Sequence, residues 1–118
     1  MRHSRYKYNI GTSPSHRKAL IKNLTAEIID HGKVKTTLTK CRAVKPYVEK
    51  LITLAKNDTV ANRRLAQSRI GNKEVVQKLF TEVGPKFKER PGGYTRINKV
   101  ADGRVGDNAK LGFISFVE

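Results

Sequence analysis

The chain has 118 residues, a length that suits one domain with one modest hydrophobic core. It carries 25 Lys and Arg residues against 10 Asp and Glu, a net charge of +15 at pH 7, and 37% hydrophobic residues. Such a charge favours a polyanionic partner, and the lack of any apolar run of about 18 residues argues against a membrane-spanning chain.

Residues 1–12 show neither helical nor strand periodicity, and we expect a basic, extended N-terminal arm there, followed by one globular domain of residues 13–118. The first acidic residue is Glu27, so no carboxylate neutralises the cations that precede it. Tyr6 and Tyr8 alternate with these cations and offer rings for base stacking. The candidate nucleic-acid-binding residues of this leading segment are Arg2, His3, Arg5, Tyr6, Lys7, Tyr8, His16, Arg17, Lys18 and Lys22.

Ser13 and Pro14 predict the start of a helix, with Ser13 as the N-cap and Pro14 at the first helical position. Leu20, Leu24 and Ile28 recur at fourfold spacing and form the apolar stripe of this helix. We expect Gly32 to end it, with His31 in the last turn, where a helix-terminal role is favoured over a catalytic one.

The residues from Lys33 to Thr37 alternate in character and predict a short strand with Val34 turned inward. A second helix is expected from Leu38 to Lys56. Because proline removes a helical hydrogen bond and crowds the preceding turn, we expect a kink or a break just before Pro46.

Two shorter helices follow in the pattern. Asp58 or Thr59 can cap a helix that runs through Arg69. Asn72 can cap another from Lys73 to about Val83, with Val76, Leu79, Phe80 and Val83 buried, and we expect Gly84-Pro85 to close it. Glycines and prolines then predict a loop over 85–93, a β-rich run over 94–100, turns over 101–109 and a final strand over 111–117.

The stretch Arg90 to Arg96 combines paired glycines with guanidinium groups and a ring. Gly92 and Gly93 permit a close approach of the backbone to phosphate, while Arg90, Tyr94 and Arg96 offer forked donors and a stacking surface. The alternative is an ordinary loop and strand with Tyr94 in the core, and the sequence leaves both open. Lys99, in the same β-rich run, is a further candidate.

Two other basic sites have alternatives of their own. Arg63 and Arg64 are candidate nucleic-acid contacts or members of a solvated helix face. Gly103-Arg-Val-Gly106 has the spacing of the GXXG loop of KH domains, but it lies between two strand patterns and beside acids, so a hairpin turn is favoured, with Arg104 still a candidate contact.

Enzymatic patterns are scarce. The three histidines form no i,i+4 pair, Cys41 is the one cysteine, and neither a G-x-S-x-G turn nor a phosphate-binding P-loop occurs. We therefore expect no catalytic residues, no metal, no cofactor and no small-molecule substrate. With no pattern of a secretory signal, we expect a cytoplasmic protein.

Eight short motifs together resemble the bacterial large-subunit ribosomal protein L17 family, in order and spacing over essentially the whole chain. They are "MRH" at the start, "SHR" at Ser15, "KTTL" at Lys35, "LITLAK" at Leu51, "VANRRLA" at Val60, "KLF" at Lys78, "RPGGYTRI" at Arg90 and "GDNA" at Gly106. The resemblance implies a non-enzymatic structural protein bound to large-subunit ribosomal RNA through the basic N-terminal segment and the glycine-tyrosine region. It also implies neighbouring large-subunit proteins, L32 among them.

The resemblance further implies a two-layer fold with the order α-β-α-α-α-β-β, which the element pattern also predicts. We therefore expect an α+β fold with a small mixed three-stranded sheet. The rival interpretation is a DNA-binding regulatory or architectural protein that places the helix around Arg63 and Arg64 in a groove. An RNA-modifying enzyme would need a cofactor pocket or a convergent acid and base, and the sequence offers no candidate for either.

Overall fold

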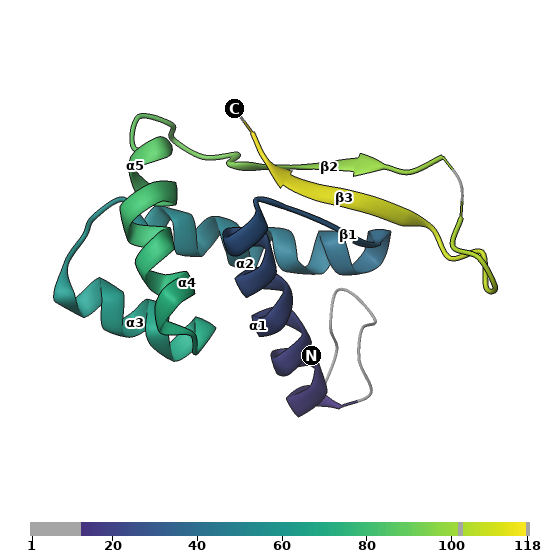
Figure 1. The fold of residues 1–118 in the computed structure, drawn as a ribbon, viewed down its shortest axis with the longest axis horizontal. Coiled ribbons are helices and arrows are strands. Elements are labelled where there is room, and N and C mark those ends of the chain that lie inside the picture. The colour runs from purple at the N-terminus through teal and green to yellow at the C-terminus, as the bar shows by residue number, and fades with distance from the viewer. Residues whose placement is uncertain (1–12, 102, 118) are drawn as a thin grey trace, which may run out of the picture.

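The fold is α+β, as predicted, with a helical layer beneath a small sheet (Figure 1). The structure is a computed structural model, and it describes residues 13–101 and 103–117. The elements in chain order are α1 (Pro14–His31), β1 (Lys33–Thr37), α2 (Leu38–Ala55), α3 (Val60–Ile70), α4 (Lys73–Lys78), the π-helical η1 (Leu79–Val83), α5 (Gly84–Lys86), β2 (Thr95–Lys99) and β3 (Leu111–Phe116).

The three strands form an antiparallel sheet in the order β1-β3-β2. The expectation of a mixed sheet was wrong. β2 and β3 are joined by a hairpin, which makes them antiparallel, and β1 pairs with the free edge of β3 in the same opposed sense. The long helical connection between β1 and β2 would allow either direction, so the sequence pattern could not decide it.

The strand register assigns each side chain to one face of the sheet. Val34, Ile114 and Ile97 lie in one row across the three strands, and Ile114 is fully buried against the helices. The neighbouring row is Lys35, Phe113 and Asn98, and the row beyond Ile114 is Lys33, Ser115 and Arg96. Since successive residues point to opposite faces, these two rows face away from the helices.

The predicted helix caps are confirmed. Ser13 Oγ accepts from the His16 backbone N–H at 3.1 Å, and Gly32 ends α1 with a left-handed φ of 80°. Thr59, and not Asp58, caps α3, and Asn72 caps α4. Each N-cap side chain satisfies an N–H group that the first helical turn leaves without a partner, and the Gly32 N–H donates to the Ile28 carbonyl at the end of α1.

Of the kink or break expected just before Pro46, the break is absent, because α2 is continuous from Leu38 to Ala55. Pro46 and Arg42 are both exposed, so the Arg42 carbonyl that loses its helical donor can bind water. Residues on the opposite face are fully buried on both sides of the proline: Cys41, Val44, Val48, Leu51 and Ile52. This packing outweighs the local cost of the proline.

The helix that starts at Lys73 also runs further than expected. Instead of ending at Gly84-Pro85, it passes through the π-helical η1 and one more turn, α5. The Gly84 N–H donates to the Leu79 carbonyl, five residues back, and Pro85, which has no N–H, begins the next turn. Gly84 is buried and lies against the C-terminal end of α2, where a Cβ would stand 2.5 Å from the Ala55 carbonyl oxygen.

Helix α2 is the centre of the core. Side chains of α1, α2, the α4 to η1 segment and the sheet bury one continuous apolar cluster, which includes Ile28, Leu51, Leu79, Phe80 and Ile114. The buried stripe predicted for residues 76–83 is confirmed. None of the helices in the described part of the chain is long and apolar enough to cross a membrane.

Candidate nucleic-acid interface

Four candidate cations or donors lie on α1. His16 and Lys18 are exposed and Arg17 is half-buried in the first turns, where no acid is present. Lys22 is half-buried and its ammonium group lies beside Gly71, at the C-terminal end of α3, where a cation is favoured by the helix dipole. Six further candidates lie outside the described residues: Arg2, His3, Arg5, Tyr6, Lys7 and Tyr8.

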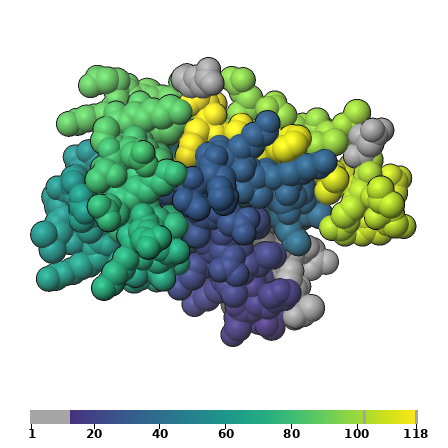
Figure 2. All heavy atoms as spheres, in the orientation of Figure 1, coloured from purple at the N-terminus to yellow at the C-terminus, as the bar shows by residue number. Residues whose placement is uncertain are grey.

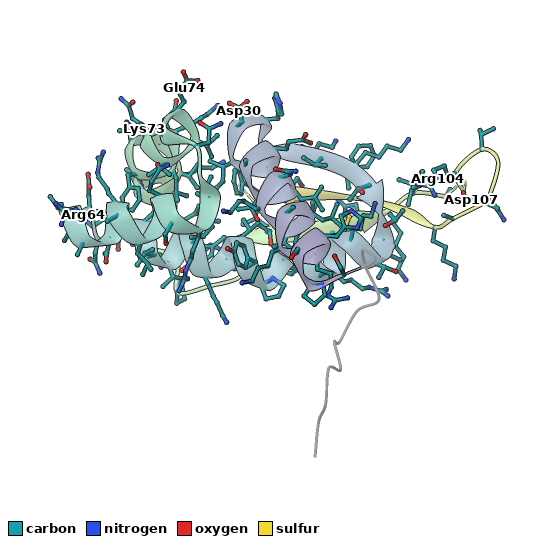
Figure 3. All side chains as sticks on the ribbon, turned by 90° about the horizontal axis from the view of Figure 1, so that it is seen from below. Asp30, Arg64, Lys73, Glu74, Arg104 and Asp107 are labelled. Atoms are coloured by element: carbon teal, nitrogen blue, oxygen red, sulfur yellow. The ribbon has the colours of Figure 1, made fainter. Side chains whose placement is uncertain are left out.

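Arg63 and Arg64 are neighbours on α3 with different surroundings. Arg63 donates to both carboxylate oxygens of Asp58, at 2.6 and 2.8 Å, and its guanidinium carbon lies 5.2 Å from the centre of the Phe80 ring. The hydrogen bond from Arg63 lowers the pKa of Asp58. Arg64 is exposed and projects from the end of the molecule (Figure 3), without an acidic partner among the described residues. Of the two, Arg64 is the better placed to bind an external phosphate.

Tyr94 lies in the core. Its exposure is 2%, its ring centre is 5.4 Å from that of Phe87, and its hydroxyl oxygen accepts from Thr53 Oγ1 at 3.1 Å. Burial acts to raise the pKa of Tyr94, but the hydrogen bonds from Lys56 and Thr53 outweigh it and the pKa is lowered. This burial supports a core tyrosine over a stacking ring, the alternative that the sequence left open.

The two glycines before Tyr94 are held in place by Arg90. The Arg90 Nε donates to the carbonyls of Gly92 and Gly93, at 3.0 and 3.1 Å, and Lys56 Nζ donates to the Arg90 carbonyl. Gly93 has a φ of 61°, which favours glycine. The segment borders an open hollow on the surface of α2, lined by Pro46, Glu49, Lys50, Thr53, Gly92, Gly93 and Tyr94.

A single carboxylate ties the start of β2 to α2. Glu49 Oε2 accepts from the Thr95 backbone N–H and the Thr95 hydroxyl, both at 3.1 Å, and from Lys45 Nζ at 3.4 Å. Thr95 is 4% exposed, so water cannot replace these bonds easily. The glycine segment therefore has a fixed position relative to the helical layer.

The face of the sheet that points away from the helices is basic and contains an aromatic ring. Figure 1 shows the helices α1 to α4 on the other side of the sheet. The Lys33 and Lys35 Nζ atoms lie 4.3 and 5.7 Å from the centre of the Phe113 ring. We name this surface the open sheet face and define it by its side chains: Lys33, Lys35, Arg96, Asn98, Phe113 and Ser115.

Of the open sheet face, sequence reasoning identified Arg96 alone. The alternation of the first strand, with Val34 inward, already implied that Lys33 and Lys35 point outward. Phe113 carried no such signal, because the last strand is apolar at most positions and its inward phase cannot be read from alternation. Lys99 has the phase of the helix-facing side, but it lies at the end of β2 and is exposed.

The loop between β2 and β3 is a hairpin connection, as favoured over a KH-like loop. Arg104 donates to both carboxylate oxygens of Asp107, with Nε 3.0 Å from Oδ1, and Figure 3 shows the two side chains together at the end of the hairpin. Val105 is fully exposed, and the hairpin stands apart from the helical body (Figure 2). The charge of Arg104 is thus partly satisfied within the loop.

We expect Asp107 to titrate near pH 2. The hydrogen bond from Arg104, followed by that from the Ala109 N–H, lowers the pKa of Asp107 from 3.8 to about 2. Because the folded-state pKa is depressed, the stabilisation by this contact is fully present above pH 3.8 and is lost as the pH falls through about 2. Carboxyl NMR titration checks the value, and Arg104→Gln should return it toward 3.8. An unchanged midpoint in that variant would contradict this account of the loop.

The histidines and acids of the described residues gather into no group of three that could hold a metal ion. His16 lies in the first turn of α1 and His31 in its last, where His31 Nε2 is 3.6 Å from an Asp30 carboxylate oxygen. His3 lies outside the described residues.

The described candidate residues therefore lie at separate places on the molecule: on α1, at Arg64 on α3, in the Arg90 to Arg96 segment and in the hairpin. A comparison with protein families identifies the chain's relatives. The family described as Ribosomal protein L17 matches residues 20–117 of the chain, which is most of its length. The chain belongs to the ribosomal protein L17 family, and it is a structural protein of the large ribosomal subunit.

Proposed function

We propose that the chain binds and stabilises large-subunit ribosomal RNA through two regions: the basic arm of residues 1–12 with the first turns of α1, and the Arg90 to Arg96 segment. The observation that carries this proposal is the family match, together with a run of 26 residues before Glu27 that contains six Lys and Arg and no acid. One RNA surface can supply many fixed phosphates to such a run, which a protein core cannot.

The arm contributes mainly electrostatic affinity. Arg2, Arg5 and Lys7 meet phosphates and release condensed counterions, and Tyr6 or Tyr8 stacks on a base or packs on a sugar. Lys18 continues this row of cations onto α1. Recognition is mainly of RNA shape, because the deep and narrow major groove of an RNA helix admits few side chains. In this proposal residues 13–118 form a single domain that carries the arm.

The glycine segment helps to position the protein on the RNA. Gly92 and Gly93 lie at the surface beside an open hollow, and Arg90 holds their carbonyls. The absence of side chains there allows a phosphate or ribose to approach the backbone closely. Arg96 provides an exposed guanidinium two residues beyond Tyr94. Tyr94 supports this segment from the core.

The partners that follow from this function are large-subunit ribosomal RNA and neighbouring large-subunit proteins, with L32 proposed among them. The protein acts in the cytoplasm as part of the assembled subunit, and the function needs no catalytic group, metal or cofactor. The rival interpretation, DNA binding by α3, is weakened by the Asp58 carboxylate that occupies Arg63.

Co-sedimentation tests the proposed function. We expect the full-length chain to be recovered at one copy per large subunit after a moderate salt wash of a cell extract. A protein that regulates or packages DNA would remain with the DNA fraction in the same gradient. Recovery of the chain with DNA, or free at the top of the gradient, would contradict the ribosomal function.

A further inference from the structure

We propose that the open sheet face is a second RNA-binding surface, which takes an unpaired nucleotide of the ribosomal RNA with its base stacked on Phe113. The flanking phosphates meet Lys33, Lys35 and Arg96. This inference rests on the proposed function, because it takes the same polymer as the ligand, but it places new contacts on β1 and β3, which neither the arm nor the glycine segment includes; Arg96 on β2 belongs to both surfaces.

The geometry brings the necessary groups together from three strands. Phe113 lies on the central strand β3, directly between Lys35 on β1 and Asn98 on β2. The next outward row places Lys33 and Arg96 on either side of Ser115. A half-buried ring at the centre therefore has cations on both flanks and one amide that can hydrogen-bond a base edge.

The charge of this face favours an anionic ligand. Strands β1, β2 and β3 contain Lys33, Lys35, Arg96 and Lys99 and no acidic residue at all. All four cations are exposed. Three acids on the elements that adjoin the strands, Asp30 on α1, Glu49 on α2 and Asp107 in the hairpin, are each already ion-paired.

The two lysines show how the ligand would be accommodated. Their ammonium groups lie 4.3 and 5.7 Å from the Phe113 ring centre, which is a cation–π arrangement worth little at an exposed site. Both side chains reach the ring from β1 and have flexible stems. They can move to the phosphates of a bound nucleotide while the base takes their place on the ring.

An RNA segment fits better than an acidic peptide. An acidic peptide would use the cations, but it would gain nothing specific from a flat ring at the centre of the sheet. Stacking of bases on aromatic side chains of an exposed sheet is a recurrent mode of recognition of unpaired RNA. A nucleotide can contact all three kinds of group: its base stacks on the ring, its base edge hydrogen-bonds the amide, and its phosphates meet the cations.

The chain contains no tryptophan, so Phe113→Trp creates a single tryptophan, which can be excited apart from the tyrosines, at the proposed stacking position. We expect the fluorescence of the full-length variant to be quenched, and shielded from acrylamide, when a folded large-subunit ribosomal RNA fragment binds. Binding of the fragment with unchanged fluorescence and unchanged quencher access would overturn the proposal.

Affinity measurements provide the second test. Phe113→Leu keeps an apolar side chain but removes the ring, and we expect it to weaken binding by about 5- to 100-fold without changing the salt dependence. The double variant Lys33→Gln, Lys35→Gln should reduce the salt slope by about two. The charge-matched control Lys86→Gln, Lys88→Gln alters exposed lysines away from this face and should bind more tightly than the β1 double variant.

The outcomes separate the two proposals. If the unaltered chain fails to bind the RNA fragment, the proposed function itself fails. If it binds and the Phe113 and β1 variants bind equally well, with their melting temperatures unchanged, the second surface is disproved while the proposed function stands. An acidic peptide that quenches the Phe113→Trp fluorescence, where the RNA fragment leaves it unchanged, would also count against the assignment.

Discussion

The affinity of the chain for a large-subunit ribosomal RNA fragment is expected to fall by about three to five orders of magnitude between about 50 and 200 mM monovalent salt. This range corresponds to roughly six to ten phosphate contacts, each of which releases a counterion. The net charge of +15, in which the internal ion pairs already cancel, supplies enough cations for that number. Filter binding or fluorescence anisotropy across the salt series measures the slope.

Substitution in the arm should change that slope by a defined amount. The triple variant Arg2→Gln, Arg5→Gln, Lys7→Gln is expected to lower it by about two to three. Lys78→Gln is the control, because Lys78 Nζ already donates to the Asp30 carbonyl at 2.5 Å and lies 3.8 Å from its carboxylate. A salt-independent affinity, or equal slopes in all three proteins, would show that phosphate contacts of the arm do not drive binding.

Replacing Gly84 with alanine is expected to lower the free energy of unfolding by about 2 to 3 kcal/mol. The new Cβ would lie 2.5 Å from the Ala55 carbonyl oxygen and 3.0 Å from its carbonyl carbon. Both atoms belong to the backbone at the end of α2, so a side-chain rotation cannot relieve the overlap and the two helices must separate. Alanine is the better helix former by up to about 1 kcal/mol, which offsets only part of this cost. Urea denaturation followed by circular dichroism measures the change.

Gly92→Ala is the matched control for this prediction. A Cβ at Gly92 meets no atom within 4 Å and needs no left-handed backbone, so the stability should change by less than about 0.5 kcal/mol. If both alanine variants unfold at the same urea concentration as the unaltered chain, the close approach of α5 to α2 is not present in solution.

Local chemistry made much of the fold predictable from the sequence. Ser13, Thr59 and Asn72 each cap a helix through a side-chain oxygen that accepts from a backbone N–H two or three residues later. Gly32 provides the left-handed residue after α1. These signals depend on neighbouring residues alone, and they place the starts of the helices and the end of the first one correctly.

The predictions that were wrong or stayed open concern contacts between segments that are distant in the sequence. Pro46 suggested a kink or a break and Gly84-Pro85 a helix end, but burial of the residues around both prolines keeps the helical segments continuous. The direction of β1 against β3 depends on how the helical elements from α2 to α5 fold back between β1 and β2. The core position of Tyr94 depends on Phe87 and Thr53, which no local pattern connects to it. Charge, by contrast, is visible in the sequence, and the basic candidates on α1 and at Arg64 and Arg96 are largely exposed.

The contacts of the Glu49 carboxylate also affect the surface that is proposed to bind RNA. Glu49 accepts two hydrogen bonds from Thr95, the first residue of β2. Thr95 follows the glycines in the chain and precedes Arg96. Glu49 therefore helps to set the spacing between the glycines and Arg96, and in the proposed RNA complex the loss of this carboxylate would misalign both with the RNA. A basic protein that binds a polyanion would thus depend on one of its own carboxylates to align its binding residues.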